Sequence, residues 1–337
     1  MAWPPEQHDA IQRAYNGARV CVTGGAGFIG SHVVETLLDF GADVAVIDDL
    51  SGSTSGRISS LLDRHARGSA RFVYASILEP RALIEAVSGA QMVFHFAAVS
   101  SPVMAIEDPA RCVQVNGLGT ARVAEAARKA EVSRMVYAAS ASAYGDAEGA
   151  NKESQAPAPI SPYGASKLAG EYTVSAWARS LGLDGVNLRF FNVYGPGQSP
   201  DSEYAAVIPA FRKRLQADQA PTIYGDGEQT RDFVHISDIV RAVLLAGAHD
   251  QPLGGATINI GSGRAVSINE LAALMAKLCG AEGLAPHHEP ARTGDIQASN
   301  CDASLASQVL GFQTTTSLED GLRDLLKDCR DRSTAVA

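Results

Sequence analysis

The chain of 337 residues lacks several features that would assign it to a class at once. It has no apolar run of about eighteen residues and no basic-then-apolar leader, so we expect neither a membrane-spanning helix nor a signal peptide. Its five cysteines are odd in number, scattered and not in ligand spacing. This pattern predicts reduced thiols in a cytoplasmic protein, with no disulfide framework and no metal site.

Positive charge is also scarce. Lysine and arginine together number 28 against 37 acidic residues, which gives a net charge of −9 and a pI near 5.4. Such a surface argues against nucleic acid or an anionic membrane as a partner. An anionic ligand would therefore need a local group of arginines. The length favours two closely packed domains, and no internal repeat is visible.

A glycine-rich stretch near the start of the chain carries the strongest signal. Gly24, Gly27 and Gly30 follow an apolar run at 18–22 and open an amphipathic segment at 31–40. This order of strand, glycines and helix places bare backbone amides and the positive end of a helix where a pyrophosphate can bind. A tight turn without a ligand is the alternative for the glycines taken alone.

The next apolar strand, at 44–47, ends in two acids, Asp48 and Asp49. A carboxylate here accepts hydrogen bonds from an adenosine ribose and repels a ribose phosphate. The sequence therefore predicts a dinucleotide site that prefers NAD to NADP, with Asp48 at the ribose and Asp49 able to share that role.

Short β-branched runs alternate with helical patterns along most of the chain. We expect strands at 70–74, 92–96, 134–139, 184–190 and 256–260, and helices at 80–87 and 116–130, besides the elements above. Alternation of this kind predicts the α/β class, here a Rossmann-type doubly wound parallel sheet with a smaller α/β domain. The expected NAD-binding domain is 17–190 with a returning segment at about 232–262. The expected second domain is 191–231 with 263–328, and 1–16 and 330–337 are expected to be loosely ordered.

A second constellation lies in the middle of the chain. Tyr163 and Lys167 are four residues apart after Pro162, so both lie on one face of a predicted helix. An ammonium group beside a phenol favours the phenolate, and so does a positive nicotinamide ring; we therefore expect a lowered pKa that makes Tyr163 a usable base. Ser140 and Ser142 follow the strand at 134–139, at the end where sheet ligands bind. Chance helical spacing and an ordinary serine-rich turn are the alternatives.

Taken in order, these motifs resemble the extended short-chain dehydrogenase/reductase family and, within it, the nucleotide-sugar 4-epimerases. The resemblance rests on TGGAGFIG (23–30), HFAA (95–98), Asn116, the Ser140 turn, Tyr163 with Lys167, RFFNVYGPG (189–197) and GDGEQTRDFVHISD (225–238). It runs from about Arg19 to Leu326 and implies an NAD-dependent enzyme that inverts C4 of a UDP-sugar.

The resemblance also implies roles for individual residues. The implied catalytic residues are Tyr163, Lys167 and Ser140. The residues implied to bind NAD are Gly24, Gly27, Phe28, Ile29, Gly30, Asp48, Asp49, Ser76, Ile77, Phe96, Ala97, Ala98, Asn116, Tyr163, Lys167 and Phe190. Those implied to contact the UDP-sugar are Ser101, Ser140, Ser142, Tyr163, Asn192, Val207, Tyr224, Arg231, Arg292, Asp295 and Ser299.

Two positions after Ser140 favour an epimerase over other branches of the family. Dehydratases and decarboxylases carry acidic residues there, because elimination needs a further proton donor and base. This chain has Ala141 and Ser142, which leaves reversible oxidation at C4. A dehydratase, decarboxylase or reductase stays open as an alternative. So does a protein of another class, a dinucleotide-binding scaffold or redox sensor.

Other positions depart from the family's pattern or bear on the substrate. Ser76 stands where relatives often carry an acid near adenine, and Met104 and Ala105 leave one wall without the usual arginine. Ser299 is small where a tyrosine would exclude an acetamido group, so we expect UDP-N-acetylhexosamines to fit as well as UDP-glucose and UDP-galactose. UDP-glucuronate stays open. The helices at 110–129 and 164–180 are rich in alanine, and the resemblance implies that they form the interface of a homodimer; crossover helices that only cover the sheet are the alternative.

Overall fold

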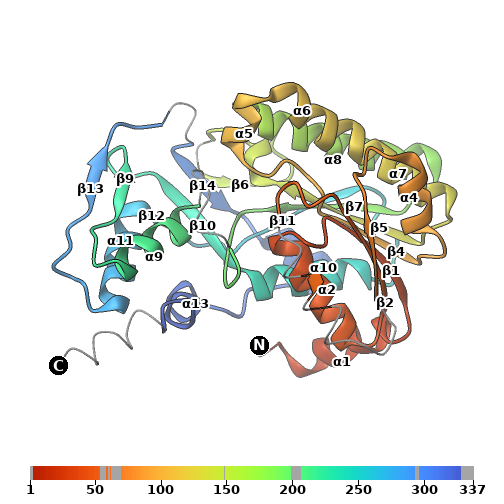
Figure 1. Ribbon diagram of the computed structural model, residues 1–337, viewed down its shortest axis with the longest axis horizontal. Coiled ribbons are helices and arrows are strands. Elements are labelled where there is room, and N and C mark those ends of the chain that lie inside the picture. Colours follow the sequence, from red (N-terminus) through yellow and green to blue (C-terminus); the bar gives the residue numbers. More distant parts are fainter. Residues whose placement is uncertain are drawn as a thin grey trace.

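A computed structural model of the chain describes residues 3–53, 58–59, 61, 70–147, 149–198, 206–292 and 296–327. It contains one large sheet covered by helices on both faces and a smaller second region built on short strands (Figure 1). Among the described residues, no helix is long and apolar enough to cross a membrane.

The large sheet has seven parallel strands in the order β11-β7-β5-β4-β1-β2-β3. Their bounds are Arg19–Thr23 (β1), Asp43–Asp48 (β2), Ala70–Tyr74 (β3), Met92–His95 (β4), Arg134–Ser140 (β5), Gly185–Phe190 (β7) and Ala256–Ile260 (β11). The chain runs outward from β1 in one direction to β3 and then outward in the other direction to β11. The order reverses between β1 and β4, the place where a doubly wound sheet binds its ligand. The predicted fold class is confirmed, including the late strand that returns to the same sheet.

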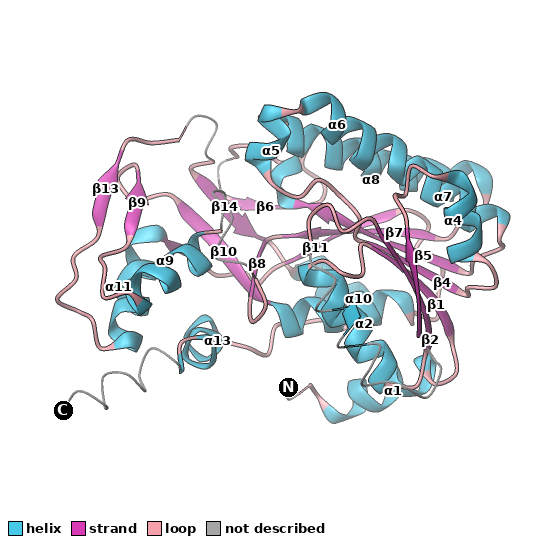
Figure 2. Cartoon of the chain, viewed as in Figure 1, coloured by secondary structure: helices cyan, strands magenta, loops and turns pink. Residues whose placement is uncertain are grey.

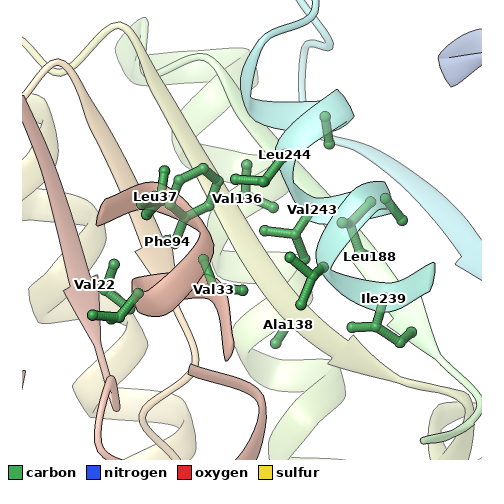
Figure 3. Packing of buried hydrophobic residues seen from close by; sticks show 14 of the residues in the cluster. Val22, Val33, Leu37, Phe94, Val136, Ala138, Leu188, Ile239, Val243 and Leu244 are labelled. Carbon is green, nitrogen blue, oxygen red and sulfur yellow. The ribbon is translucent and has the colours of Figure 1, made fainter. Parts of the chain in front are cut away.

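Helices cover the two faces of this sheet. On one face lie α2 (Phe28–Asp39), α10 (Ile236–Gly247) and α12 (Ser304–Leu310); on the other lie α4 (Pro80–Val87), α7 (Thr120–Lys129) and α8 (Pro162–Leu181). Figure 3 shows Leu37 of α2 and Val243 of α10 packing onto the sheet beside Phe94. The inner strands of the sheet are buried on both faces, which is why they read as continuous apolar runs rather than as alternating patterns.

The smaller region has its own sheets and core. Its main sheet contains β6 (Ala150–Asn151), β8 (Asn192–Tyr194), β10 (Thr230–His235), β12 (Ala265–Ser267) and β14 (Ala298–Cys301), and β9 (Thr222–Tyr224) pairs with β13 (His287–Glu289). Helices α9 (Val207–Gln216), α11 (Ile268–Cys279) and α13 (Leu318–Leu325) pack there around Phe211, Leu271 and Leu322 (Figure 2).

The N-terminal segment is a folded helix, so the expectation of a loosely ordered lead-in at 1–16 is wrong for its described part. Helix α1 spans Pro5–Tyr15 and buries Ile11 and Tyr15, and Trp3 packs before it. The Tyr15 hydroxyl donates a hydrogen bond of 2.8 Å to the carbonyl of Leu244 in α10. Two apolar residues four apart supplied a helical face that the polar composition concealed. The other expected tail, 330–337, lies outside the described residues.

The helix expected at 116–130 is built from two pieces, a π-helical turn and an α-helix, which follow two short helices. After α5 (Pro102–Glu107) come α6 (Pro109–Val113), a π-helical turn η1 (Gln114–Gly119) and α7. The side chain of Asp108 caps α6 by accepting a hydrogen bond from the Arg111 amide. A π-helical turn places Asn116 differently from a regular helix, and such turns often occur at functional sites.

Candidate active site

The glycine turn is packed too closely for any other residue at two positions. Gly24 has a φ of +70°, and a Cβ there would lie 2.5 Å from the amide nitrogen of Ala97. A Cβ on Gly30 would lie 2.1 Å from the carbonyl oxygen of Gly24. The turn can therefore approach the end of β4 and hold the first turn of α2 close to β1.

The start of α2 has the chemistry of an anion site. Its N-cap is Gly27, which has no side chain to bond the first amides, and Phe28 and Ile29 follow at once. The first amides of a helix have no partner within the helix, and its dipole favours negative charge there. The residues present therefore fit a bound pyrophosphate.

Asp48 is fixed beside this turn at the end of β2. One of its carboxylate oxygens accepts the amide of Ala26 at 3.0 Å, and the other accepts the amide of Leu50 at 2.8 Å. Burial raises the pKa of Asp48, and these two backbone hydrogen bonds act in the opposite direction. Asp49 accepts a hydrogen bond from the amide of Ser51 in the turn that follows. A half-buried carboxylate next to the glycine turn fits the predicted contact with a ribose.

A chain of buried hydrogen bonds supports the floor of the site, and the sequence did not reveal it. The Nδ1 of His95 lies 2.6 Å from the Thr23 hydroxyl, and its Nε2 lies 2.9 Å from the Thr120 hydroxyl. Thr120 in turn donates to the carbonyl of Asn116 at 2.6 Å. Burial lowers the pKa of His95 to about 3, so the ring is neutral and links β1 and β4 to α7. The quoted HFAA motif was the one available signal.

Asn116 is fully enclosed. Its amide oxygen accepts the amide hydrogen of Val99 at 2.8 Å, and its amide nitrogen donates to the Ser166 hydroxyl at 2.9 Å. Ser166 donates to the carbonyl of Tyr163. Asn116 therefore ties the segment after β4 to the first turns of α8 and acts on the site through them.

Tyr163, Lys167 and Ser140 meet at the carboxyl end of β5. Helix α8 begins with Ser161 as its N-cap and Pro162 in its first turn, as predicted. The Ser140 side chain lies close enough to Tyr163 to lower the pKa of that phenol, and it accepts the amide of Ser142 at 3.1 Å. Gly164 allows this approach, because a Cβ there would lie 2.5 Å from the carbonyl oxygen of Ser142.

The expected lowering of the tyrosine pKa is not found in the chain itself. Burial raises the pKa of Tyr163, and the hydrogen bond with Ser140 only opposes that rise. Burial also lowers the pKa of Lys167 to about 7, so this lysine carries less charge near neutral pH than a solvated one. Its ammonium lies 4.4 Å from the centre of the Tyr137 ring. The sequence argument counted the charges of the lysine and the nicotinamide ring but left out desolvation, which acts in the opposite direction.

On the substrate side, the second sheet brings three predicted residues together. Asn192 on β8 donates through its amide to the carbonyl of Asp232 at 3.1 Å. Arg231 on β10 stands directly opposite Ser299 on β14, and Ser299 is 9% exposed. These strands place an amide, a guanidinium and a small hydroxyl in one neighbourhood.

Arg292 lies with Tyr224 rather than in that cluster. Its guanidinium stacks 3.8 Å from the centre of the Tyr224 ring, at the two-stranded sheet of β9 and β13. The carbonyl of Tyr224 accepts the side-chain amide of Gln229, one residue before β10. Asp295 lies outside the described residues.

The remaining predicted residues have varied surroundings. Ser101 caps α5 by accepting the amide of Met104, which is 45% exposed, whereas Ala105 is buried. Ser76 accepts the amide of Leu78, and Ile77 is buried against Gly119. Those that lie at strand ends or at the start of a helix are Phe96, Ala97 and Ala98 after β4, Phe190 at the end of β7, Ser142 after β5 and Val207 at the start of α9. The described residues contain no group of histidine, cysteine and acidic side chains arranged to hold a metal ion.

Comparison with known proteins identifies the family. Residues 20–261 match the model of the NAD dependent epimerase/dehydratase family. The chain belongs to this family. It is 37% identical to the UDP-glucose 4-epimerase of Mycolicibacterium smegmatis over 94% of this chain and 99% of that protein.

Solved structures agree. The UDP-N-acetylglucosamine 4-epimerase of Methanobrevibacter ruminantium, in complex with UDP-N-acetylmuramic acid, superposes with a TM-score of 0.86 at 31% identity, covering 95% of this chain and 99% of that one. MoeE5 in complex with UDP-glucuronic acid and NAD superposes with a TM-score of 0.80 at 37% identity, covering 94% and 100%. Membership confirms the predictions of a Rossmann-type fold, an enzyme and NAD as cofactor. These relatives also support the predicted epimerase reaction.

Proposed function

We propose that this enzyme inverts C4 of a UDP-sugar through a 4-keto intermediate, acting on UDP-N-acetylglucosamine and UDP-N-acetylgalactosamine, on UDP-glucose and UDP-galactose, or on both pairs. The observation that carries the proposal is that α8 brings Tyr163 to the Ser140 side chain at the carboxyl end of β5, with Lys167 one helical turn later. The turn after Ser140 offers only Ala141 and Ser142, so it contains no acid for elimination or decarboxylation.

In this proposal the cofactor is held by the first region of the fold, 17–190 with 232–262. The amides of Phe28 and Ile29 bind the pyrophosphate of NAD, Asp48 the adenosine ribose and Lys167 the nicotinamide ribose. When bound, NAD accepts the hydride from C4 and returns it. The enclosed positions of Asn116 and Ile77 make them supports of this site.

Tyr163 moves the proton in the proposed mechanism. Its phenolic oxygen takes the proton of the sugar's 4-hydroxyl, directly or through the Ser140 hydroxyl, and returns it after the sugar has presented its other face. Because burial raises the pKa of Tyr163 in the chain itself, the base form depends on positive charge placed beside the ring. Lys167 is the side chain available for this within α8.

The second region, 191–231 with 263–328, holds the UDP group in this scheme. Asn192, Arg231 and Arg292 bind the diphosphate and uridine, so the uncharged 4-keto ring can turn about its linkage. The stacking of Arg292 on Tyr224 gives that guanidinium a fixed plane, which suits contact with phosphate oxygens.

In this proposal the enzyme distinguishes sugars by their substituents at C2 and C6. Ser299 is small and buried beside Arg231, which leaves room for an acetamido group. UDP-glucuronate is a second candidate, supported by MoeE5 having been solved with UDP-glucuronic acid. A carboxylate would have to be met by serines such as Ser101 and by backbone amides, because this wall has Met104 in place of an arginine.

A panel of UDP-sugars tests the function. The purified enzyme, given no added NAD, is expected to convert at least one C4 pair to an equilibrium mixture detected by NMR. The Tyr163→Phe protein is the control, since it keeps the fold and loses only the phenolic oxygen. A product formed by loss of water or of carbon dioxide from the sugar, or no conversion of any sugar, would reject an epimerase.

We also propose a cytoplasmic homodimer. On α8 the residues Ala165, Ala169, Tyr172 and Ala176 form an exposed apolar stripe at helical spacing. Gly117 in η1 packs against Ala169, and Val113 and Leu118 beside it are 51% and 46% exposed. Two such helices from each subunit would form a closed interface. Four described cysteines are free and buried, which agrees with a reducing compartment.

The assembly has a direct test. Tyr172→Glu is expected to yield a monomer in light scattering at micromolar concentration, because it puts a charge in the centre of the stripe. Ile84→Glu is the matched control: Ile84 is 64% exposed on α4, away from the stripe, and its variant should stay a dimer. A monomeric unmodified protein would reject the proposal.

A further inference from the structure

Helix α8 carries a buried acid that the proposed mechanism does not use. Glu171 follows Lys167 by four residues, so it shares the face that carries Tyr163 and Lys167. Its side chain is 3% exposed, and Lys167 is 4% exposed. A buried carboxylate one turn from a buried ammonium is expected to pair with it.

Glu171 instead pairs with an arginine from the sheet. Arg189 on β7 donates from Nε to one carboxylate oxygen at 2.8 Å and from Nη2 to the other at 2.6 Å. Both oxygens are thus held in a two-point contact, the strong form of an arginine–carboxylate pair. The arginine side chain is itself 3% exposed.

Arg189 also contacts the turn that follows Ser140. Its guanidinium lies 4.4 Å from the centre of the Tyr144 ring, and the Tyr144 hydroxyl donates to Asn259 at 2.7 Å. In the sheet, Arg189 is in register with Ala139, the residue before Ser140. One side chain therefore links the helix of Tyr163 and Lys167 to the turn of Ser140.

Lys167 is left with a different partner. Its ammonium stacks over the Tyr137 ring at 4.4 Å, and the Tyr137 hydroxyl donates to the carbonyl of Lys167 at 3.2 Å. This contact holds the lysine against β5 without neutralising it by a carboxylate. A stacked ammonium keeps its donors available to a ligand.

We propose that Arg189 is a positioning residue, which occupies both oxygens of Glu171 and so keeps that carboxylate from drawing Lys167 away from the cofactor side of the site. This inference rests on the proposed roles of Lys167 and Tyr163. Without Arg189, Glu171 is a buried charge with no counterion, and the nearest one is the lysine four residues earlier.

The pH at which Lys167 titrates depends on whether Glu171 is paired with Arg189. The titratable groups around it come from every element that packs on it: Tyr163 and Glu171 on α8, Tyr137 on β5, His95 on β4 and Cys112 on α6, with Arg189 behind Glu171. Burial lowers the pKa of Lys167, and Cys112 and, by a smaller amount, Glu171 oppose that lowering. A Glu171 released by Arg189 would raise that pKa further.

Arg189→Gln is the first test, with three readouts. The Lys167 signal in ¹³Cε-lysine NMR, assigned with Lys167→Met among the six lysines of the chain, should titrate at a higher pH than in the unmodified protein. The dissociation constant of NAD, measured by calorimetry, should rise about tenfold, and turnover should fall as the lysine is drawn away. The matched control is Arg134→Gln, which breaks the buried Arg134–Asp184 pair at the opposite end of β5 and should lower stability alone.

The double variant Arg189→Gln/Glu171→Gln decides the matter. It removes the carboxylate as well, so NAD affinity and the Lys167 titration should return most of the way to those of the unmodified protein. A double variant no better than Arg189→Gln, or an unchanged Lys167 titration in Arg189→Gln, overturns the proposal and leaves Arg189 a structural residue.

Two milder variants keep the test open where Arg189→Gln does not fold. Glu171→Gln is isosteric and should move the Lys167 titration to lower pH. Arg189→Lys keeps one charge and one contact, so its Lys167 titration should fall between those of the unmodified protein and Arg189→Gln. Failure of either shift overturns the proposal. The NMR readout needs no substrate, so an absence of epimerase activity in the unmodified protein would reject the proposed function and leave this test intact.

Discussion

Arg231 and Ser299 stand opposite each other on two parallel strands, β10 and β14. They belong to segments far apart in the sequence, and only the register of this sheet makes them neighbours. Ser299 is nearly buried beside Arg231, so a larger side chain at that position would have to displace its neighbours or extend along the same face of the sheet. The residue predicted to hold the diphosphate and the residue predicted to measure the sugar are therefore parts of one surface.

Ser299→Tyr should change the choice of sugar. The larger ring fills the space left for an acetamido group, so turnover of the N-acetylhexosamine pair should fall at least tenfold while the hexose pair is retained, a difference of about 1.4 kcal/mol in transition-state binding. Initial rates on both pairs measure it. Ser299→Ala serves as control and should keep both activities. Equal loss of both pairs in Ser299→Tyr would contradict a role in measuring C2.

Tyr163→Phe should abolish most activity without unfolding the protein. It removes one oxygen and with it the general base, at a cost of about 10²-fold or more in turnover. Ser140→Ala should be milder, since water can replace the hydroxyl that lies beside Tyr163. Circular dichroism and NAD binding check the fold of both. Near-normal turnover of Tyr163→Phe would exclude the mechanism.

Stability should fall on acidification because of His95. Burial lowers its folded pKa to about 3, whereas the unfolded chain has the ordinary value of 6.5. Between these two values the unfolded state binds more protons, so stability is complete above pH 6.5 and is lost as the pH falls toward 3, by up to about 1.4 kcal/mol per pH unit. Urea unfolding at pH 7.5 and pH 5.0 measures the slope. In His95→Gln the change of unfolding free energy with pH should be smaller. An unchanged pH dependence would mean that groups other than His95 cause it.

Helix α1 should contribute to the stability of the whole fold. Ile11 is 1% exposed in the main core, so Ile11→Ala should lower the free energy of unfolding by about 2–5 kcal/mol. Gln12→Ala, on the exposed side of the same helix, is the control and should change it little. Chemical denaturation measures both. Equal effects would mean that α1 is only loosely attached.

The sequence predicted the elements of the large sheet closely. The strand at 70–74 and the helix at 80–87 have the predicted bounds, and the strand at 256–260 returns to the sheet as expected. Buried parallel strands are recognised as apolar runs and the connecting helices as amphipathic segments. Both patterns are visible in the sequence because the regular spacing of side chains along a helix or strand decides which of them face the core. The glycine turn was also predicted from the sequence, since Gly24 satisfies a local requirement for a positive φ.

The sequence by itself thus determined the fold class, the family, the cofactor and the residues that meet at the carboxyl end of β5, because these depend on short motifs in a fixed order. Only the tertiary structure decided what depends on contacts between distant segments. It attached α1 through Tyr15 to Leu244, placed Arg231 opposite Ser299, and paired Arg189 with Glu171 and not Lys167 with Glu171. It also set burial against the expected lowering of the Tyr163 pKa, because desolvation is a property of the folded surroundings and not of spacing along a helix.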